Sequence, residues 1–310
     1  MANAPAEMGF VHDQIPSRED ERPVGDRFTG ASPAQTIPAK ATCALSVIYL
    51  LLLLVAHRLP APDQAWATVG ALLLFVFLPL AIVYHGVRIP LDAKTQVFSG
   101  AVALAIWLAL AGLDRAADAA LLAPARSLAL VMACLFFGMF ASRVIRDRNL
   151  LVPACIVAAV ADILSVGWGF TGRALEHAPD LVTKLSVAVP TMALAPVAAG
   201  HPQYPLVATM GAGDIFFIGL FFAAAARFGL PMKKTFVFVY PLVVLALAMA
   251  VFDVIPWIGI PGLPFICAGF LAANTRAFSL SRDEWRALGA VAVLVVIAMV
   301  ALFVIRGLSS

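Results

Sequence analysis

The chain has 310 residues, of which 62% are hydrophobic and 13% are charged, and its formal net charge is +3. A soluble domain carries about 25% charged residues, so this composition excludes an ordinary soluble fold and indicates a polytopic membrane protein. The small net charge gives no indication of a nucleic-acid partner. Ala, Leu and Val dominate the apolar runs, which favours spanning helices over barrel strands. We therefore expect an all-α fold in the lipid bilayer.

The first 39 residues are polar, with Pro, Gly, Ser and charges of both signs. This composition is typical of a disordered tail, and the segment lacks the basic start and apolar core of a signal peptide. The next region, 40–149, is expected to hold four spanning helices, at about 41–56, 67–85, 97–113 and 124–142.

The region 150–275 carries the residues with chemical interest. We expect spanning helices at about 150–170, 206–226 and 235–252, and a shorter one at about 261–275. Within 276–310, a last helix is expected at about 287–305. The total is about nine spanning helices.

The apolar segment 185–200 contains Pro190 and Pro196. Each proline removes a backbone donor and breaks or kinks a helix, and the segment is short for a span. We favour a re-entrant or surface-lying segment over a crossing. Helices 150–170 and 206–226 are then antiparallel, and Asp162 and Asp214 both lie about 12 Å from the same membrane face. If 185–200 does cross, the two carboxyl groups no longer share one depth.

The distribution of basic residues favours a cytoplasmic N-terminus. With nine crossings in that orientation, the inner segments hold 15 Lys and Arg residues, and the outer segments and helix ends hold 6. This asymmetry follows the positive-inside rule. Both aspartates then lie nearer the outer face. The alanine-rich composition and short loops indicate a prokaryotic plasma membrane.

Two carboxyl groups inside apolar helices predict chemistry. An ionisable residue at membrane depth costs about 2.5–3.5 kcal/mol on insertion scales, so it indicates a function. Two such groups close together share a proton. The ionised one can then draw a proton from water while the protonated one polarises a carbonyl, as in aspartic proteases. The alternative is a proton- or ion-coupled transporter that uses the same pair.

Small and helix-breaking residues accompany the second aspartate. Glycines at 211 and 213 remove two Cβ atoms beside Asp214 and let another backbone come close, although small residues also pack helices together. Further along, two prolines enclose Gly-Leu. They prevent a regular helix start and leave backbone groups available to a strand-like ligand. The residues expected to shape the site are Gly211, Gly213, Pro261, Gly262, Leu263 and Pro264.

Together these residues resemble the presenilin and signal peptide peptidase family of intramembrane aspartyl proteases. Ala161-Asp162 resembles the family's Tyr-Asp helix, residues 211–214 its Gly-x-Gly-Asp motif, and residues 261–264 its Pro-Ala-Leu motif. Residues 172–179 look like the presenilin loop after the first aspartate. The resemblance covers roughly 150–275. Ala161 and Gly262 depart from the pattern, and four helices rather than the family's five precede the first aspartate.

The resemblance implies a presenilin-like bundle with Asp162 and Asp214 as the catalytic pair, and no cofactor. It implies transmembrane helices as substrates, with the stretch 171–205 helping to admit them. The orientation resembles that of signal peptide peptidase and predicts substrates with a cytoplasmic N-terminus. A prepilin-peptidase-like protease is the alternative within enzymes, but no Lys follows Asp214 and no paired cysteines are present. A family member that binds helices without cutting them is a third possibility.

Cysteine and histidine side chains give no sign of a metal site. The four cysteines lie in or beside apolar runs without a CxxC pair, and the five histidines are scattered. We expect the cysteines to pack as small hydrophobic residues, and we expect no metal.

Overall fold

The computed structural model describes residues 33–56, 65–113, 119–167, 184–189, 208–252 and 260–279, with isolated positions between 282 and 297. The described residues form eight α-helices, two 3₁₀ turns and two short strands. Six of these helices are long and apolar enough to cross a membrane. The protein is therefore a predominantly helical, polytopic membrane protein, as its composition predicts.

The first four helices lie close to their predicted positions. The structure has α1 at Pro33–Ala56, α2 at Ala65–Gly86, α3 at Ala93–Leu113 and α4 at Ala119–Ser142. Helix α1 begins at Pro33, inside the segment 1–39 that was expected to be a tail, and a proline in the first turn of a helix costs little because its missing N–H has no partner there. Residues 1–32 lie outside the described part.

The second half of the chain is arranged around shorter elements. In order, these are η1 (Arg148–Leu150), α5 (Leu151–Gly167), β1 (Ser186–Val189), β2 (Ala208–Gly211), α8 (Ala212–Arg227), α9 (Met232–Val251), α10 (Leu263–Asn274) and η2 (Thr275–Ala277). The expected helix at 287–305 is described only at isolated helical positions, so the number nine is not established by the described residues.

A strand precedes α8, which corrects the predicted helix at 206–226. Strands β1 and β2 pair antiparallel, with Ser186 opposite Gly211. Gly211 has extended backbone angles, φ −64° and ψ 149°, so the helix begins only at Ala212. The fold remains predominantly helical, as predicted, and this short hairpin is an addition that the sequence did not predict. The 16 residues of α8 extend about 24 Å, which is shorter than the roughly 30 Å core of a bilayer.

The same correction changes the position of Asp214. The sequence placed it well inside a spanning helix, whereas it lies in the first turn of α8. The argument for equal depth, which counted helical residues from Leu206, is therefore wrong. Of the segment 185–200, only residues up to 189 are described, and these form β1 rather than a helix.

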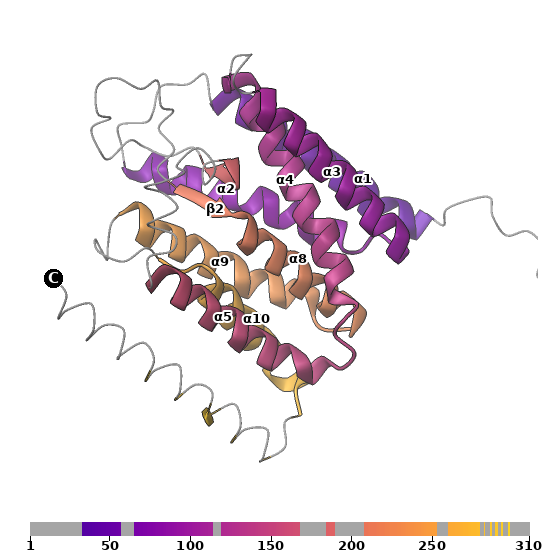
Figure 1. Ribbon diagram of the computed structural model, residues 1–310, viewed down its shortest axis with the longest axis vertical. Helices are drawn as coiled ribbons and strands as arrows, with labels where there is room; N and C mark the ends of the chain where they lie inside the picture. The colour runs from indigo at the N-terminus through magenta and orange to yellow at the C-terminus, as the bar shows by residue number, and fades with distance from the viewer. Residues whose placement is uncertain are drawn as a thin grey trace, which may run out of the picture. The chain divides into compact units, whose positions relative to one another are not determined.

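Helix α4 lies between α3 and α8 and contacts both along its length (Figure 1). Two glycines permit the close approach of α4 and α8. A Cβ atom on Gly138 would lie 2.7 Å from the backbone oxygen of Phe216, and one on Gly219 would lie 3.3 Å from the backbone oxygen of Cys134. Small residues at helix interfaces are typical of membrane proteins.

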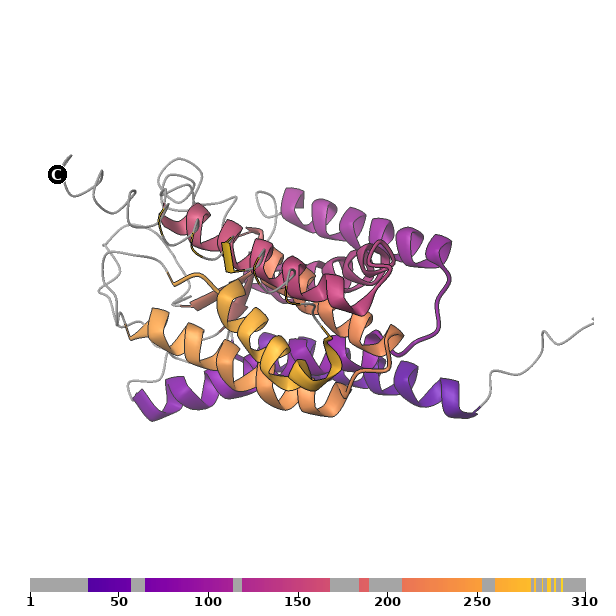
Figure 2. The same cartoon turned by 90° about the horizontal axis from the view of Figure 1, so that it is seen from below.

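Helices α5 and α10 lie side by side in both views (Figures 1 and 2). At one end, Asn149 Nδ2 donates to the backbone oxygen of Ser279 at 3.2 Å, and the Ser279 N–H donates to Asn149 Oδ1 at 3.2 Å. This pair joins the start of α5 to the chain just after α10. The helices are therefore antiparallel, and the N-terminus of α10 lies beside the C-terminal half of α5, which carries Asp162.

Candidate active site

Asp162 accepts a hydrogen bond from the start of α10. The backbone N–H of Leu263 donates to Asp162 Oδ2 at 2.9 Å, and the backbone of Gly262 also interacts with this carboxyl group. Leu263 is the first residue of α10, and the first N–H groups of a helix have no partner within it. A carboxylate satisfies such a donor and interacts favourably with the positive end of the helix dipole.

Asp214 lies at the N-terminus of its own helix. The backbone N–H of Gly211 donates to Asp214 Oδ2 at 3.2 Å, which is the bond that an acidic residue in the first turn makes to the cap residue. The other carboxyl oxygen faces Gly262. A Cβ atom built on Gly262 would lie 2.7 Å from Asp214 Oδ1 and 3.0 Å from its Cγ, so a side chain there is incompatible with this position of the carboxyl group.

The start of α10 thus contacts both aspartates through adjacent residues. Gly262 packs against Asp214, while Leu263 donates to Asp162. The structure thus brings together both predicted aspartates and three of the six residues expected to shape the site: Asp162, Asp214, Gly211, Gly262 and Leu263.

The two glycines before Asp214 have different surroundings. A Cβ atom on Gly211 would make an ordinary contact, 3.5 Å from Asp214 Oδ2. Gly213 is exposed, and a Cβ atom there would have nothing within 4 Å. Packing within the described structure therefore does not explain the glycine at position 213.

The two prolines of the motif flank the contact between α10 and the aspartates. Pro264 occupies the first turn of α10, where its missing N–H is tolerated. Pro261 precedes the helix and is partly buried. Neither is described in direct contact with a carboxyl group, so their contribution within the described residues is to fix where α10 begins.

Ala161, which stands where the resembling family has tyrosine, is exposed on α5. Val157, one turn earlier on the same helix, is 61% exposed. This side of α5 therefore presents small and apolar side chains beside Asp162. Residues 168–183 and 190–207 lie outside the described part of the chain. The first of these ranges includes residues 172–179, which extend the resemblance.

Sequence reasoning missed the β-hairpin that leads into Asp214. The backbone N–H of Ala212 donates to the oxygen of Leu185, just before β1, at 3.0 Å. Val187 and Met210 are buried, with 1% and 2% exposure. Alternation of small and β-branched residues in Ser-Val-Ala-Val at 186–189 is the one signal that favoured a strand.

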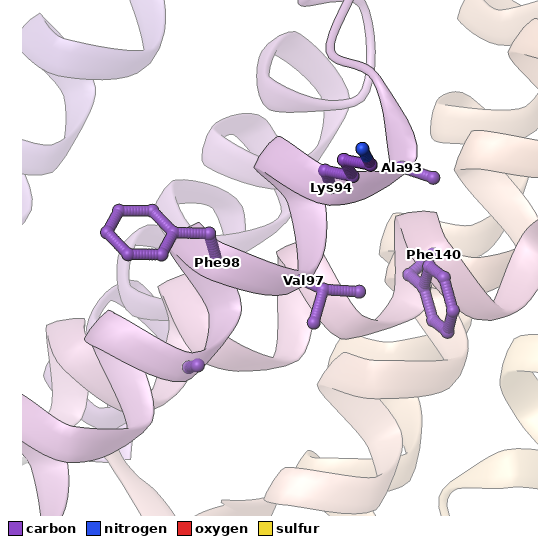
Figure 3. Close-up of a pocket in the computed structure, with 6 residues that line it drawn as sticks. Ala93, Lys94, Val97, Phe98 and Phe140 are labelled. Atoms are coloured by element: carbon purple, nitrogen blue, oxygen red, sulfur yellow. The ribbon is translucent and has the colours of Figure 1, made fainter.

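A second surface feature carries no comparable chemistry. An open apolar pocket lies on α3 and α4, where Val97 stands between Phe98 and Phe140 (Figure 3). Its remaining lining residues are Ala93, Lys94 and Ala101. Phe98 is 69% exposed, which fits a helix face in contact with lipid. Among the described residues, no three His, Cys, Asp or Glu side chains lie close enough together to bind a metal ion.

Comparison with known proteins gives no relative of this chain. Neither protein-family models, nor curated proteins, nor solved structures match this chain.

Proposed function

We propose that the protein is an intramembrane aspartic endopeptidase whose catalytic residues are Asp162 and Asp214. The observation that carries this proposal is the convergence of both carboxyl groups on the start of α10, where Gly262 contacts one and Leu263 donates to the other. Two carboxyl groups that meet at one apolar site can share a proton. They can therefore act as base and acid in the same reaction.

The chemistry requires only the two side chains and one water molecule. The ionised carboxylate takes a proton from water, whose oxygen attacks the carbonyl carbon of the scissile peptide. The protonated carboxyl group donates its proton to the carbonyl oxygen, giving a gem-diol. The carboxyl group that took the proton from water then gives it to the peptide nitrogen as the C–N bond breaks. The other carboxylate takes a proton from a gem-diol hydroxyl, so the pair again holds one proton.

The surroundings of Gly213 support access by a peptide backbone. A Cβ atom on Gly213 would have no described neighbour within 4 Å, and this glycine lies next to Asp214 in the first turn of α8. A backbone can approach a glycine more closely than any other residue. A transmembrane helix must unwind locally before it is cut, since its carbonyl groups are hydrogen-bonded within the helix.

We further propose that the chain is a member of the presenilin and signal peptide peptidase family. The order of the three motifs supports this, and so does the contact of the third motif with both aspartates. The excess of basic residues on the predicted inner side supports substrates with a cytoplasmic N-terminus. Reporter fusions at Lys184 and Lys233 test the orientation, and a cytoplasmic signal at Lys184 would overturn it.

The test of the proposed reaction is cleavage of a single-span reporter by the purified protein in liposomes. We expect two products from the wild type and none from Asp162→Ala or Asp214→Ala, each verified as folded by its unfolding transition. The same liposomes, loaded with a pH-sensitive dye, report proton flux. Aspartate-dependent flux without cleavage would replace the protease with a transporter. Neither flux nor cleavage across several reporters would favour a protein that binds helices without cutting them.

A further inference from the structure

A chain of hydrogen bonds connects α3 with the hairpin that precedes Asp214. Trp107, which is 6% exposed on α3, donates from Nε1 to the backbone oxygen of Lys184 at 3.1 Å. Lys184 in turn donates from Nζ to the backbone oxygen of Ala111, in the last turn of α3, at 3.0 Å. The last carbonyl groups of a helix lack intrahelical donors, and a cation there interacts favourably with the helix dipole. The two residues therefore bind each other's segments reciprocally.

The connection continues from Lys184 to the catalytic helix. The next residue, Leu185, accepts a hydrogen bond from the N–H of Ala212, the first residue of α8, at 3.0 Å. Ser186 then pairs with Gly211 across the hairpin. Gly211 finally donates to the carboxyl group of Asp214. Each step is a direct contact between neighbouring groups.

We propose that Lys184 and Trp107 are positioning residues for the Asp214 carboxyl group. They hold the segment before β1 against the C-terminus of α3, and this segment in turn fixes the cap and first turn of α8. The inference rests on the proposed proteolytic function for its catalytic consequence. Its structural part, the attachment of the start of α8 to α3, can be tested separately.

Trp and Lys at the end of a spanning helix can also serve as anchors at the membrane interface. An anchoring role depends on amphipathic bulk and charge rather than on one N–H donor. It therefore predicts that Trp107→Phe behaves as the wild type. A positioning role predicts a loss in this variant, because phenylalanine keeps the ring but cannot donate to the oxygen of Lys184.

The activity test compares Lys184→Met, Lys184→Arg and Trp107→Phe in the reconstituted cleavage assay. We expect kcat to fall about 10- to 100-fold in Lys184→Met and several-fold in Trp107→Phe, since misplacement of a catalytic group by about 1 Å costs as much as a hundredfold. KM should stay within about twofold, and Lys184→Arg should restore most of kcat because it keeps a cationic donor. Two controls should remain as the wild type: Lys94→Met at the other end of α3, and Trp66→Phe at an exposed position. Unchanged kcat in Lys184→Met and Trp107→Phe would overturn the proposal.

Hydrogen exchange tests the attachment without any cleavage. In the purified protein, the peptide that contains the Ala212 amide should exchange several-fold faster in Lys184→Met and Trp107→Phe than in the wild type. Lys184→Arg and Lys94→Met should leave it unchanged. Equal exchange in all variants would overturn the proposal even if the wild type is an active protease. Faster exchange in a protein that cleaves nothing would keep the attachment and reject the proposed enzyme.

Discussion

Helix α8 carries glycines in two regions that differ in their surroundings. In its middle, Gly219 lies against α4, and Gly138 of α4 lies against the backbone of α8 at Phe216. In its first turn, Gly213 has no described neighbour at the place of a Cβ atom, two residues after the strand ends. The sequence marks Gly213 through the Gly-x-Gly-Asp motif, but it gives no sign that Gly138 and Gly219 meet across two helices.

The comparison shows two uses of glycine: close packing of two helices, and space beside the Asp214 carboxyl group. At Gly138 and Gly219 the absent side chains allow two backbones to approach, which stabilises the α4–α8 pair. At Gly213 no described neighbour uses the space, although glycine in a helix costs about 1 kcal/mol relative to alanine. Under the proposed function, the space beside Asp214 admits the backbone of the substrate. Substitutions at these positions should therefore affect different properties.

The largest effect is expected from removing the carboxyl chemistry while keeping the shape. Asp162→Asn and Asp214→Asn should each lower kcat/KM by about a thousandfold or more, since an amide cannot exchange the shared proton. The midpoint of thermal unfolding should change little in either variant, because the side chains are isosteric. Cleavage above one tenth of the wild-type rate in either variant would remove that residue from the catalytic pair.

The next effect is expected at the contact between α10 and Asp214. Gly262→Ala places a methyl group where the carboxyl group now lies, 2.7 Å from Oδ1. Asp214 must move, and we expect kcat/KM to fall about 10- to 100-fold. The matched control is Gly269→Ala on the same helix, where a Cβ atom would lie 2.9 Å from Val239 Cα. That variant should lose stability rather than activity per folded molecule. Wild-type kcat/KM in Gly262→Ala would mean that the observed contact is not needed for catalysis.

A third prediction concerns the packed glycines. Gly138→Ala should lower the free energy of unfolding by about 1–3 kcal/mol, because the added methyl group meets backbone atoms of Phe216 and Leu220. Unfolding of the detergent-solubilised protein measures this change, and activity per folded molecule should remain near that of the wild type. An unchanged free energy of unfolding would show that α4 and α8 separate at little cost.

The smallest effect is expected at the open glycine. Gly213→Ala should leave the free energy of unfolding unchanged or raise it by up to about 1 kcal/mol. It should nevertheless raise KM several-fold, because the methyl group occupies the space offered to a substrate backbone. Steady-state kinetics with a single-span reporter measure KM. The open space has no role in binding if KM is the same as in Gly211→Ala, whose methyl group would make only an ordinary contact with Asp214.

Apolar runs predicted most of the helices but not the junction at the site. Long uninterrupted runs placed α2, α3 and α4 within a few residues of their observed positions. The run that begins at Leu206 predicts one helix, since hydropathy alone does not separate a short buried strand from a helix. The strand became visible only through its pairing with β1, a long-range contact that no local pattern specifies.

The sequence predicts which side chains lie at the candidate site, but it does not predict the backbone groups that bind them. Asp162 and Asp214 stand out because carboxyl groups are costly in apolar helices. The N–H of Leu263 and the oxygen of Leu185 carry no sequence signal, because every residue has these groups. Gly262 departs from the family motif in sequence, and its contact with Asp214 gives a steric reason for glycine there.

The most direct test of the central claim is binding of a peptide whose scissile amide is replaced by a secondary alcohol. Such a group resembles the tetrahedral intermediate, and transition-state analogues bind about 10²- to 10⁸-fold more tightly than substrates. With a photoreactive label on the peptide, we predict saturable labelling of the wild type that is abolished in Asp162→Asn and in Asp214→Asn. It should be weakened in Gly213→Ala and unchanged in Gly138→Ala. Labelling that persists equally in both aspartate variants, or is absent from the wild type, would contradict a single site formed by the two carboxyl groups.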